Sequence, residues 1–132
     1  MTDVEPDPVV LDASALLAML QSEPGSEAVG SLMDHASIST VNWSEVFQKA
    51  IDHGIPTDGL REDLEALGLA IVPFSAAQAE GAAYLRSSIQ SFGLSLADRA
   101  CLALAADLGL QAVTVDRAWG DLSIGGEVRV LR

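Results

Sequence analysis

Four acidic residues stand at points in the chain where short apolar runs give way to segments that favour helix. They are Asp12, Glu45, Asp98 and Asp116. In a sheet of parallel strands, ligands gather beyond the carboxyl ends of the strands, and these positions lie at or near such ends. Carboxylates held together repel one another unless protons or a cation compensate. Because Mg²⁺ and Mn²⁺ prefer oxygen ligands, the pattern predicts a site for a hard divalent ion.

The same acids also have a purely structural interpretation. A carboxylate near a helix N-terminus accepts hydrogen bonds from free amides and meets the positive end of the helix, for about 0.3 to 1 kcal/mol. Taken singly, each acid fits that use, whereas four independent caps at one sheet edge are a weaker explanation than one shared site. Zinc is disfavoured, because Cys101 is the only cysteine and the two histidines show no paired spacing.

Apolar runs and helix-favouring segments alternate along the chain. Strands are predicted at residues 9–11, 37–40, 69–74, 112–115 and 128–131, and helices at 15–20, from 26 to about 33, 42–54, 60–67, from 75 and from 95 to 108. A single helical turn is expected between the last two strands. Strands that alternate with helices predict an α/β fold, with a mostly parallel five-stranded sheet covered by helices on both faces.

Three helix starts are predicted from a capping residue followed three positions later by an acid or amide. The pairs are Asn42 with Glu45, Ser75 with Gln78, and Ser95 with Asp98. Asn42 and Ser44 are therefore interpreted as caps. The helix that follows Ser95 is apolar nearly all round until Gly109 ends it, which predicts that it lies in the interior against the sheet.

Composition bounds the class of protein. With 132 residues, 49% of them hydrophobic and 20% charged, we expect one folded domain over residues 1–132, with an acidic, flexible lead at 1–7. The net charge of −12 provides no long-range attraction for nucleic acid. One cysteine suits a reducing compartment. The lead has no basic region and the chain has no apolar run long enough for a membrane span, so we expect a cytoplasmic protein that does not bind membranes.

The acids lie within four short segments that occur in a fixed order. These are VVLDASA at 9–15, VNWSEV at 41–46, LSLADRA at 94–100 and TVDRAW at 114–119. Together they resemble the motifs of the PIN-domain family, most closely the VapC-type ribonuclease toxins of bacterial toxin–antitoxin pairs. The resemblance covers nearly the whole chain and implies a three-layer PIN-like sandwich.

The resemblance also implies an activity and partners. The four acids would bind Mg²⁺ or Mn²⁺ at an RNA phosphodiester, which a metal-activated water would hydrolyse by in-line attack. Ser14 and Thr114 match hydroxyl positions that help to hold such a site. A small VapB-type antitoxin would be the protein partner, and the helical segments at 15–33 and 60–67 would leave an apolar groove for it and for a homodimer contact. From the sequence alone, Leu60, Leu64 and Leu67 are instead interpreted as core residues.

Further residues near the motifs each have two interpretations. Arg99 and Arg117 adjoin proposed ligands and are candidate RNA phosphate contacts, or else make ordinary ion pairs. Asp121 is a further acid near the fourth motif, interpreted as a surface residue. A non-catalytic scaffold with a PIN-like fold is the alternative function. A receiver-type phosphoryl-transfer domain is disfavoured, because it needs a lysine at a late strand end and the only lysine is Lys49.

Overall fold

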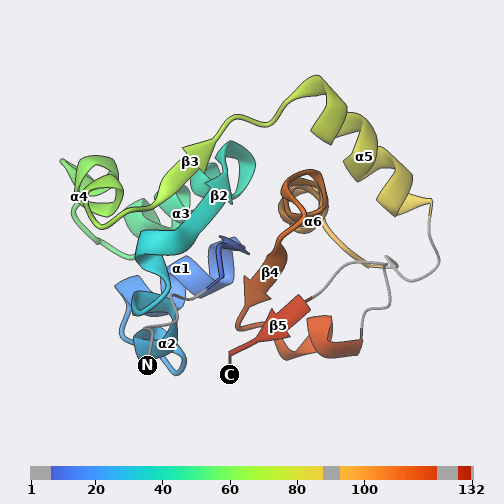
Figure 1. Ribbon diagram of the computed structural model, residues 1–132. Coiled ribbons are helices and arrows are strands. Elements are labelled where there is room, and N and C mark those ends of the chain that lie inside the picture. The colour runs from blue at the N-terminus through green and yellow to red at the C-terminus, as the bar shows by residue number, and fades with distance from the viewer. Residues whose placement is uncertain (1–6, 88–92, 122–127, 132) are drawn as a thin grey trace, which may run out of the picture.

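A five-stranded sheet runs through the middle of the molecule, and its neighbouring strands are all parallel (Figure 1). The computed structural model describes residues 7–87, 93–121 and 128–131. The strands are β1 (Val9–Leu11), β2 (Ala36–Ser39), β3 (Ala70–Val72), β4 (Gln111–Thr114) and β5 (Val128–Val130). Their order across the sheet is β3-β2-β1-β4-β5. The predicted α/β class is confirmed, and the sheet is parallel throughout.

Helices cover both faces of the sheet. They are α1 (Ala13–Leu20), α2 (Ser26–Gly30), α3 (Thr40–Asp52), α4 (Leu60–Ala66), α5 (Ala76–Arg86) and α6 (Leu96–Leu108), with the 3-10 turns η1 (Met33–His35) and η3 (Arg117–Asp121). The one helix expected from 26 to about 33 is therefore a short α2 followed by η1. The turn predicted between the last two strands is η3.

The alternation of side chains along β1 divides the interior into two cores. Val9 and Leu11 pack with residues of α1 to α4, whereas Val10 packs with Cys101 and Leu104 of α6. Successive strand residues point to opposite faces, so a strand that is apolar at every position is buried on both sides. The three-layer arrangement is thereby confirmed, with α6 in the interior as its composition predicts.

Strand boundaries differ from the predicted ones by one or two residues in every strand but β1. The difference matters at the end of β2, where Ser39 is the N-cap of α3 and its side chain accepts a hydrogen bond from the Val41 amide. The interpretation of Asn42 and Ser44 as caps is therefore wrong. Both lie inside α3, because the strand passes directly into the helix without a loop.

The other two predicted helix starts are confirmed. Ser75 caps α5 by accepting a hydrogen bond from the Gln78 amide, and Ser95 with Asp98 forms a reciprocal capping box at α6. Gly109 ends α6 in the left-handed conformation that glycine adopts without strain. Of the acidic lead, residues 1–6 lie outside the described part. Within the described ranges, no helix combines the length and apolar character that a membrane crossing requires.

Candidate active site

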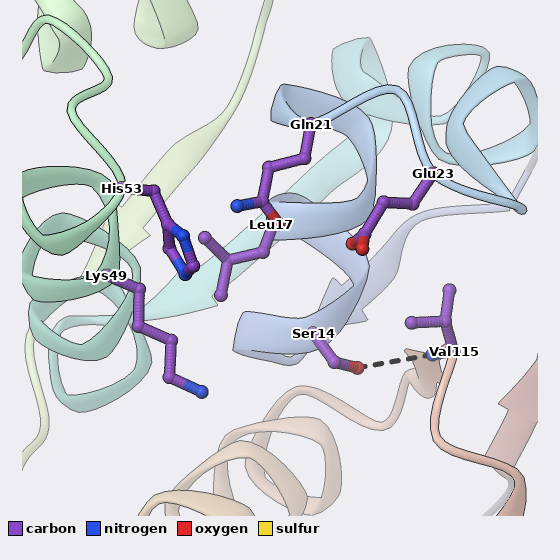
Figure 2. A pocket seen from close by; sticks show the side chains of 7 residues that line it. All are labelled: Ser14, Leu17, Gln21, Glu23, Lys49, His53 and Val115. Atoms are coloured by element: carbon purple, nitrogen blue, oxygen red, sulfur yellow. Dashed lines mark hydrogen bonds between the residues drawn. The ribbon is translucent and has the colours of Figure 1, made fainter.

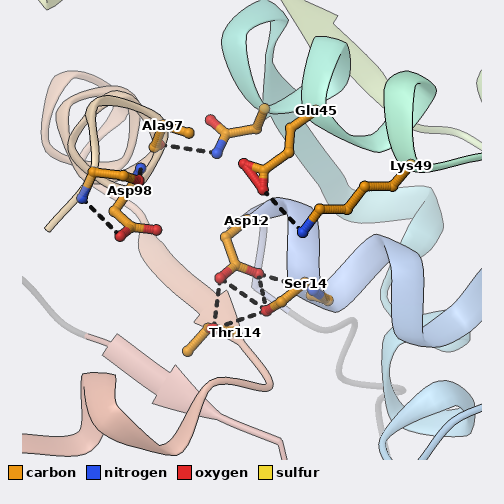
Figure 3. A network of polar contacts seen from close by, with 10 residues as sticks. Asp12, Ser14, Glu45, Lys49, Ala97, Asp98 and Thr114 are labelled. Carbon is orange, nitrogen blue, oxygen red and sulfur yellow. Dashed lines mark hydrogen bonds and ion pairs between the residues drawn. The ribbon is translucent and has the colours of Figure 1, made fainter. Parts of the chain in front are cut away.

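Asp12 lies at the junction of β1 and α1, at the carboxyl edge of the sheet. It is the N-cap of α1, and its Oδ1 accepts a hydrogen bond from the Ala15 amide at 2.8 Å. The hydroxyls of Ser14 and Thr114 also donate to its carboxylate, at 2.8 Å and 2.6 Å (Figure 3). Only 4% of Asp12 is exposed. The sequence pattern therefore places a carboxylate in the interior and surrounds it with donors.

Burial raises the pKa of Asp12 to about 6. The hydrogen bonds from Thr114, Ala15 and Ser14 lower the pKa, and the nearby charge of Asp98 raises it further. Among the described residues, no ion pair joins Asp12 to a basic side chain. The fold therefore holds a buried carboxylate whose charge is offset by neutral donors alone, and a cation at this place would be stabilised.

A network of hydroxyls joins the ends of β1 and β4. Thr114 Oγ1 donates to Asp12 and accepts a hydrogen bond from the Asp116 amide at 2.9 Å. Ser14 Oγ lies 3.1 Å from Thr114 Oγ1 and accepts from the Val115 amide at 3.3 Å. Asp116 is exposed, and its Oδ1 accepts from the Ala118 amide at 3.0 Å. Asp116 is thus connected to Asp12 through Thr114, while its carboxylate caps the η3 turn.

Glu45 and Asp98 extend the site from two helices on opposite faces of the sheet. Figure 3 shows their carboxylates turned toward Asp12, Glu45 from α3 and Asp98 from the first turn of α6. Asn42 joins the two helices, because its Nδ2 donates to the Ala97 carbonyl oxygen at 2.9 Å. The Asn42 Oδ1 atom is buried and has no hydrogen-bond partner among the described residues.

The capping interpretation applies to three of the four acids. Asp12, Asp98 and Asp116 each accept a hydrogen bond from a backbone amide at the start of a helix or turn. Glu45 does not fit that interpretation, since α3 begins at Thr40 and Glu45 lies in its second turn. Its partner is Lys49, whose Nζ is 3.7 Å from Glu45 Oε2. A cap therefore explains no part of the position of Glu45.

We tested whether these residues fit a divalent cation. Within the described ranges, no three His, Cys, Asp or Glu side chains are close enough together to form a preassembled cluster, and Glu45, Asp98 and Asp116 each contact a partner of their own. The donor chemistry fits, because Mg²⁺ keeps several waters and needs only one or two direct carboxylates. The uncompensated Asp12 carboxylate is the acceptor that such a hydrated ion would satisfy.

The two arginines proposed for RNA contact have different surroundings. Arg99 donates from Nη1 to the Ala82 carbonyl oxygen at 3.0 Å, so part of its guanidinium joins α6 to α5. Arg117 is exposed at the start of η3. Asp121 is the last residue of η3, and its side chain lies outside the described part. Contact of either arginine with RNA stays a prediction.

Lys49 was not predicted as a site residue. Its spacing from Glu45 was the available signal, because residues four apart on a helix are neighbours on one face. Glu45, Lys49 and His53 repeat this interval along α3 and its C-cap. The only lysine of the chain therefore stands beside a candidate metal ligand.

A family model described as the PIN domain matches residues 9–124. No curated protein sequence matches the chain significantly. Three solved structures are similar in fold. A toxin-antitoxin complex from Klebsiella pneumoniae has a TM-score of 0.75 and 23% sequence identity, over 94% of this chain and 98% of the other. A DNA-bound VapBC from Salmonella typhimurium has a TM-score of 0.72 and 16% identity, over 96% of this chain and 100% of the other. The sarcin-ricin loop cleaving toxin VapC20 from Mycobacterium tuberculosis has a TM-score of 0.67 and 12% identity, over 89% of this chain and 98% of the other.

Proposed function

The chain belongs to the PIN domain family, and from that premise we propose that it is a metal-dependent endoribonuclease, the VapC-type toxin of a toxin–antitoxin pair. The observation that carries this proposal is the environment of Asp12. A carboxylate that is 4% exposed, without a basic partner in the described residues, and faced by Glu45 and Asp98, has the chemistry of a cation ligand. An ordinary helix cap gains nothing from that burial, because burial disfavours its charged form.

The chain's own residues have distinct parts in the proposed reaction. Asp12, Glu45, Asp98 and Asp116 would hold Mg²⁺ or Mn²⁺, with Ser14 and Thr114 keeping Asp12 in place. When bound, the ion supplies an activated water and neutralises charge on the phosphate oxygens. The hydroxyl network fixes the orientation of the Asp12 carboxylate, so the ligand needs no reorganisation before reaction.

A small VapB-type antitoxin is the proposed protein partner, and the active form is a homodimer in the cytoplasm. The similar structures from Klebsiella and Salmonella are a toxin-antitoxin complex and a VapBC complex, which supports such a partner here. The similar VapC20 is a toxin that cleaves the sarcin-ricin loop, which supports RNA as the substrate class.

Cleavage of cellular RNA tests the enzymatic proposal. The purified protein is incubated with total RNA in Mg²⁺ or Mn²⁺, with and without chelator, and new ends are sequenced. We expect chelator-sensitive cuts that Asp12→Asn abolishes. The matched control is Asp58→Asn, which removes an exposed acid from the turn before α4 and should leave cleavage unchanged.

Absence of chelator-sensitive cuts by the wild-type chain, with normal folding and antitoxin binding, would contradict the enzyme and favour the scaffold. One observation favours the alternative function, a non-catalytic scaffold: Glu45 already pairs with Lys49, and Asp98 already accepts a hydrogen bond from the Ser95 amide. Equal cleavage by wild type and Asp12→Asn would likewise remove Asp12 from the reaction.

A further inference from the structure

A pocket opens beside the Asp12 network, between α1 and the C-terminal half of α3 (Figure 2). It has a volume of ≈ 220 Å³. The lining residues are Ser14, Leu17, Gln21, Glu23, Lys49, His53 and Val115. Ser14 also donates a hydrogen bond to Asp12, so the pocket and the candidate active site share one residue. A molecule bound in the pocket would therefore lie next to whatever is held at Asp12.

The walls of the pocket combine opposite chemical characters. Lys49 and His53 enter from α3 and its C-cap, one helical turn apart. Gln21 and Glu23 come from the end of α1 and the turn after it. Leu17 and Val115, both buried, provide the apolar part of the lining. A ligand that fits this lining has an anionic group, polar edges and an apolar face, and these three features occur together in a nucleotide.

We propose that this pocket binds one nucleotide of the RNA next to the scissile phosphodiester, with Lys49 contacting a phosphate and with Gln21 and His53 contacting the base or ribose. The inference rests on the proposed function, since it places the substrate of that reaction. The pocket would then help to choose which phosphodiester reaches the metal.

The size of the pocket favours a single nucleotide over a larger ligand, and Lys49 provides a contact for its phosphate. Pockets that enclose drug-sized molecules measure about 300 to 1,000 Å³, so this smaller one suits a single base with its sugar. The Lys49 ammonium group lies 3.7 Å from Glu45 Oε2, and half of the Lys49 side chain is exposed, so a phosphate can contact it beside that ion pair.

The charge of the whole chain makes this lysine more important. With 7 basic and 19 acidic residues, the chain has no general attraction for RNA, so binding depends on local contacts. Bases of single-stranded RNA are unstacked and available for such contacts, whereas paired bases are not. The pocket therefore predicts preference for an unpaired nucleotide beside the cleaved bond.

Titration of the metal-free, ¹⁵N-labelled protein with the four nucleoside 5′-monophosphates tests binding directly. In chelator, we expect amide shifts for Ser14, Gln21 and His53 that saturate with the best nucleotide. Gln21→Ala and His53→Ala should each weaken that binding about threefold to tenfold, the effect of one hydrogen bond. Gln48→Ala is the matched control, because Gln48 is exposed on α3 and does not line the pocket.

Cleavage kinetics on a single-stranded oligoribonucleotide provide the second measurement. The same two variants should raise KM by a similar factor with kcat nearly unchanged, because they remove binding and leave the metal ligands in place. Lys49→Met should reduce the slope of log affinity against log salt by about one, as expected for one lost phosphate contact. Arg61→Met, an exposed cation on α4, is its control.

The outcomes separate this inference from the proposed function. Chelator-sensitive cleavage with unchanged KM in both pocket variants overturns the nucleotide pocket and leaves the enzyme. Nucleotide binding at Gln21 and His53 without any RNA cleavage overturns the enzyme and supports the pocket. Shifts confined to other residues overturn the pocket. If the variants weaken antitoxin binding instead, with nucleotide affinity unchanged, the pocket receives a protein side chain and the inference is wrong.

Discussion

Thr114 donates a 2.6 Å hydrogen bond to Asp12 where β4 and β1 end side by side. Leu11 pairs with Val113 in the sheet, and Asp12 and Thr114 are the residues that directly follow this pair in the chain. Parallel pairing in this register brings a hydroxyl and a carboxylate together that are 102 residues apart in the chain. The position of Asp12 therefore depends on the whole sheet having formed.

Thr114→Val should destabilise the protein, because it removes the shortest hydrogen bond to a buried carboxylate. The expected loss is about 1.5 to 3 kcal/mol at pH 7, the range for hydrogen bonds to charged groups. Denaturant unfolding of the metal-free protein measures it. Thr114→Ser keeps the hydroxyl and should recover most of the loss. Unchanged stability of Thr114→Val would mean that the hydrogen bond to Asp12 does not stabilise the fold, and a loss in Thr114→Ser alone would assign the stabilisation to the methyl group.

The raised pKa of Asp12 predicts how stability changes with pH. In the folded protein Asp12 keeps its proton up to about pH 6, whereas its usual pKa is 3.8. The folded state therefore binds more protons between these values, so the contribution of Asp12 is fully present below pH 3.8 and is lost as pH rises through 6. The largest loss is about 3 kcal/mol, since one pKa unit corresponds to about 1.4 kcal/mol.

Asp12→Asn should remove this pH dependence, so the stability of the metal-free variant relative to wild type should rise as pH increases from 4 to 8. Urea unfolding at a series of pH values between 4 and 8 gives the free energy of unfolding of wild type and variant. The difference between the two free energies reports on Asp12 alone, because the other acids titrate in both proteins. Asp58→Asn should give a profile parallel to that of wild type. A difference that stays constant across this range would show that Asp12 is ionised throughout.

Two variants at the start of α6 separate capping from chemistry at Asp98. Ser95→Ala removes the N-cap hydroxyl that binds the Asp98 amide, and should cost about 1 kcal/mol of stability without loss of RNA cleavage. Asp98→Asn keeps an acceptor for the Ser95 amide and removes the charge that raises the pKa of Asp12. That variant should be as stable as wild type or more so, and inactive. Parallel losses of stability and activity in both variants would reduce Asp98 to a cap.

A side chain at position 68 should strongly reduce the stability of the protein. The φ of Gly68 is +111°, and a Cβ there would lie 2.5 Å from Asp34 Cα. Gly68→Ala therefore combines left-handed strain with a backbone collision, and should destabilise by more than the roughly 1 to 2 kcal/mol of strain alone. Gly109→Ala is the control, because its φ is +67° and no atom lies within 4 Å of the added carbon. Similar unfolding midpoints for the two variants would contradict the collision.

The sequence predicted the order of strands and helices because burial leaves a continuous apolar run wherever a strand is covered on both faces, as in β1. It also predicted the two serine caps of α5 and α6, since capping depends on residues three apart. It failed at Asn42, where the pattern matched a cap. A buried amide that joins α3 to Ala97 of α6 uses the same residue type, and local spacing does not distinguish the two.

The candidate site was predictable in outline only. Asp12 and Asp116 could be assigned to one sheet edge from the strand pattern, whereas Thr114 was assigned only from the resemblance to the PIN-domain motifs. The burial of Asp12 and the exposure of Asp116 depend on packing. Position at a strand end therefore predicted both as equivalent metal ligands and did not distinguish the buried acid from the exposed one. The partner of Glu45 was visible in the four-residue spacing to Lys49. The pocket beside them requires α1 and α3 to be adjacent, which no local pattern indicates.

Addition of Mg²⁺ or Mn²⁺ should raise the melting temperature, because only the folded protein brings the ligands together. At a metal concentration about tenfold above Kd, binding adds about 1.4 kcal/mol, which corresponds to a rise of about 5 °C for a chain of this size. Differential scanning fluorimetry at constant ionic strength measures it.

Constant ionic strength is necessary because a chain of net charge −12 is also stabilised by unspecific screening. Asp12→Asn and Glu45→Gln should each lose most of the metal-induced rise, whereas Asp58→Asn, which changes the net charge by the same amount, should retain it. Glu45→Gln is the more informative of the two, because Glu45 caps no helix and its loss leaves the Asp12 hydrogen bonds intact. An equal rise in all four proteins would mean that the cation acts on net charge, and the acids at the sheet edge would then be structural.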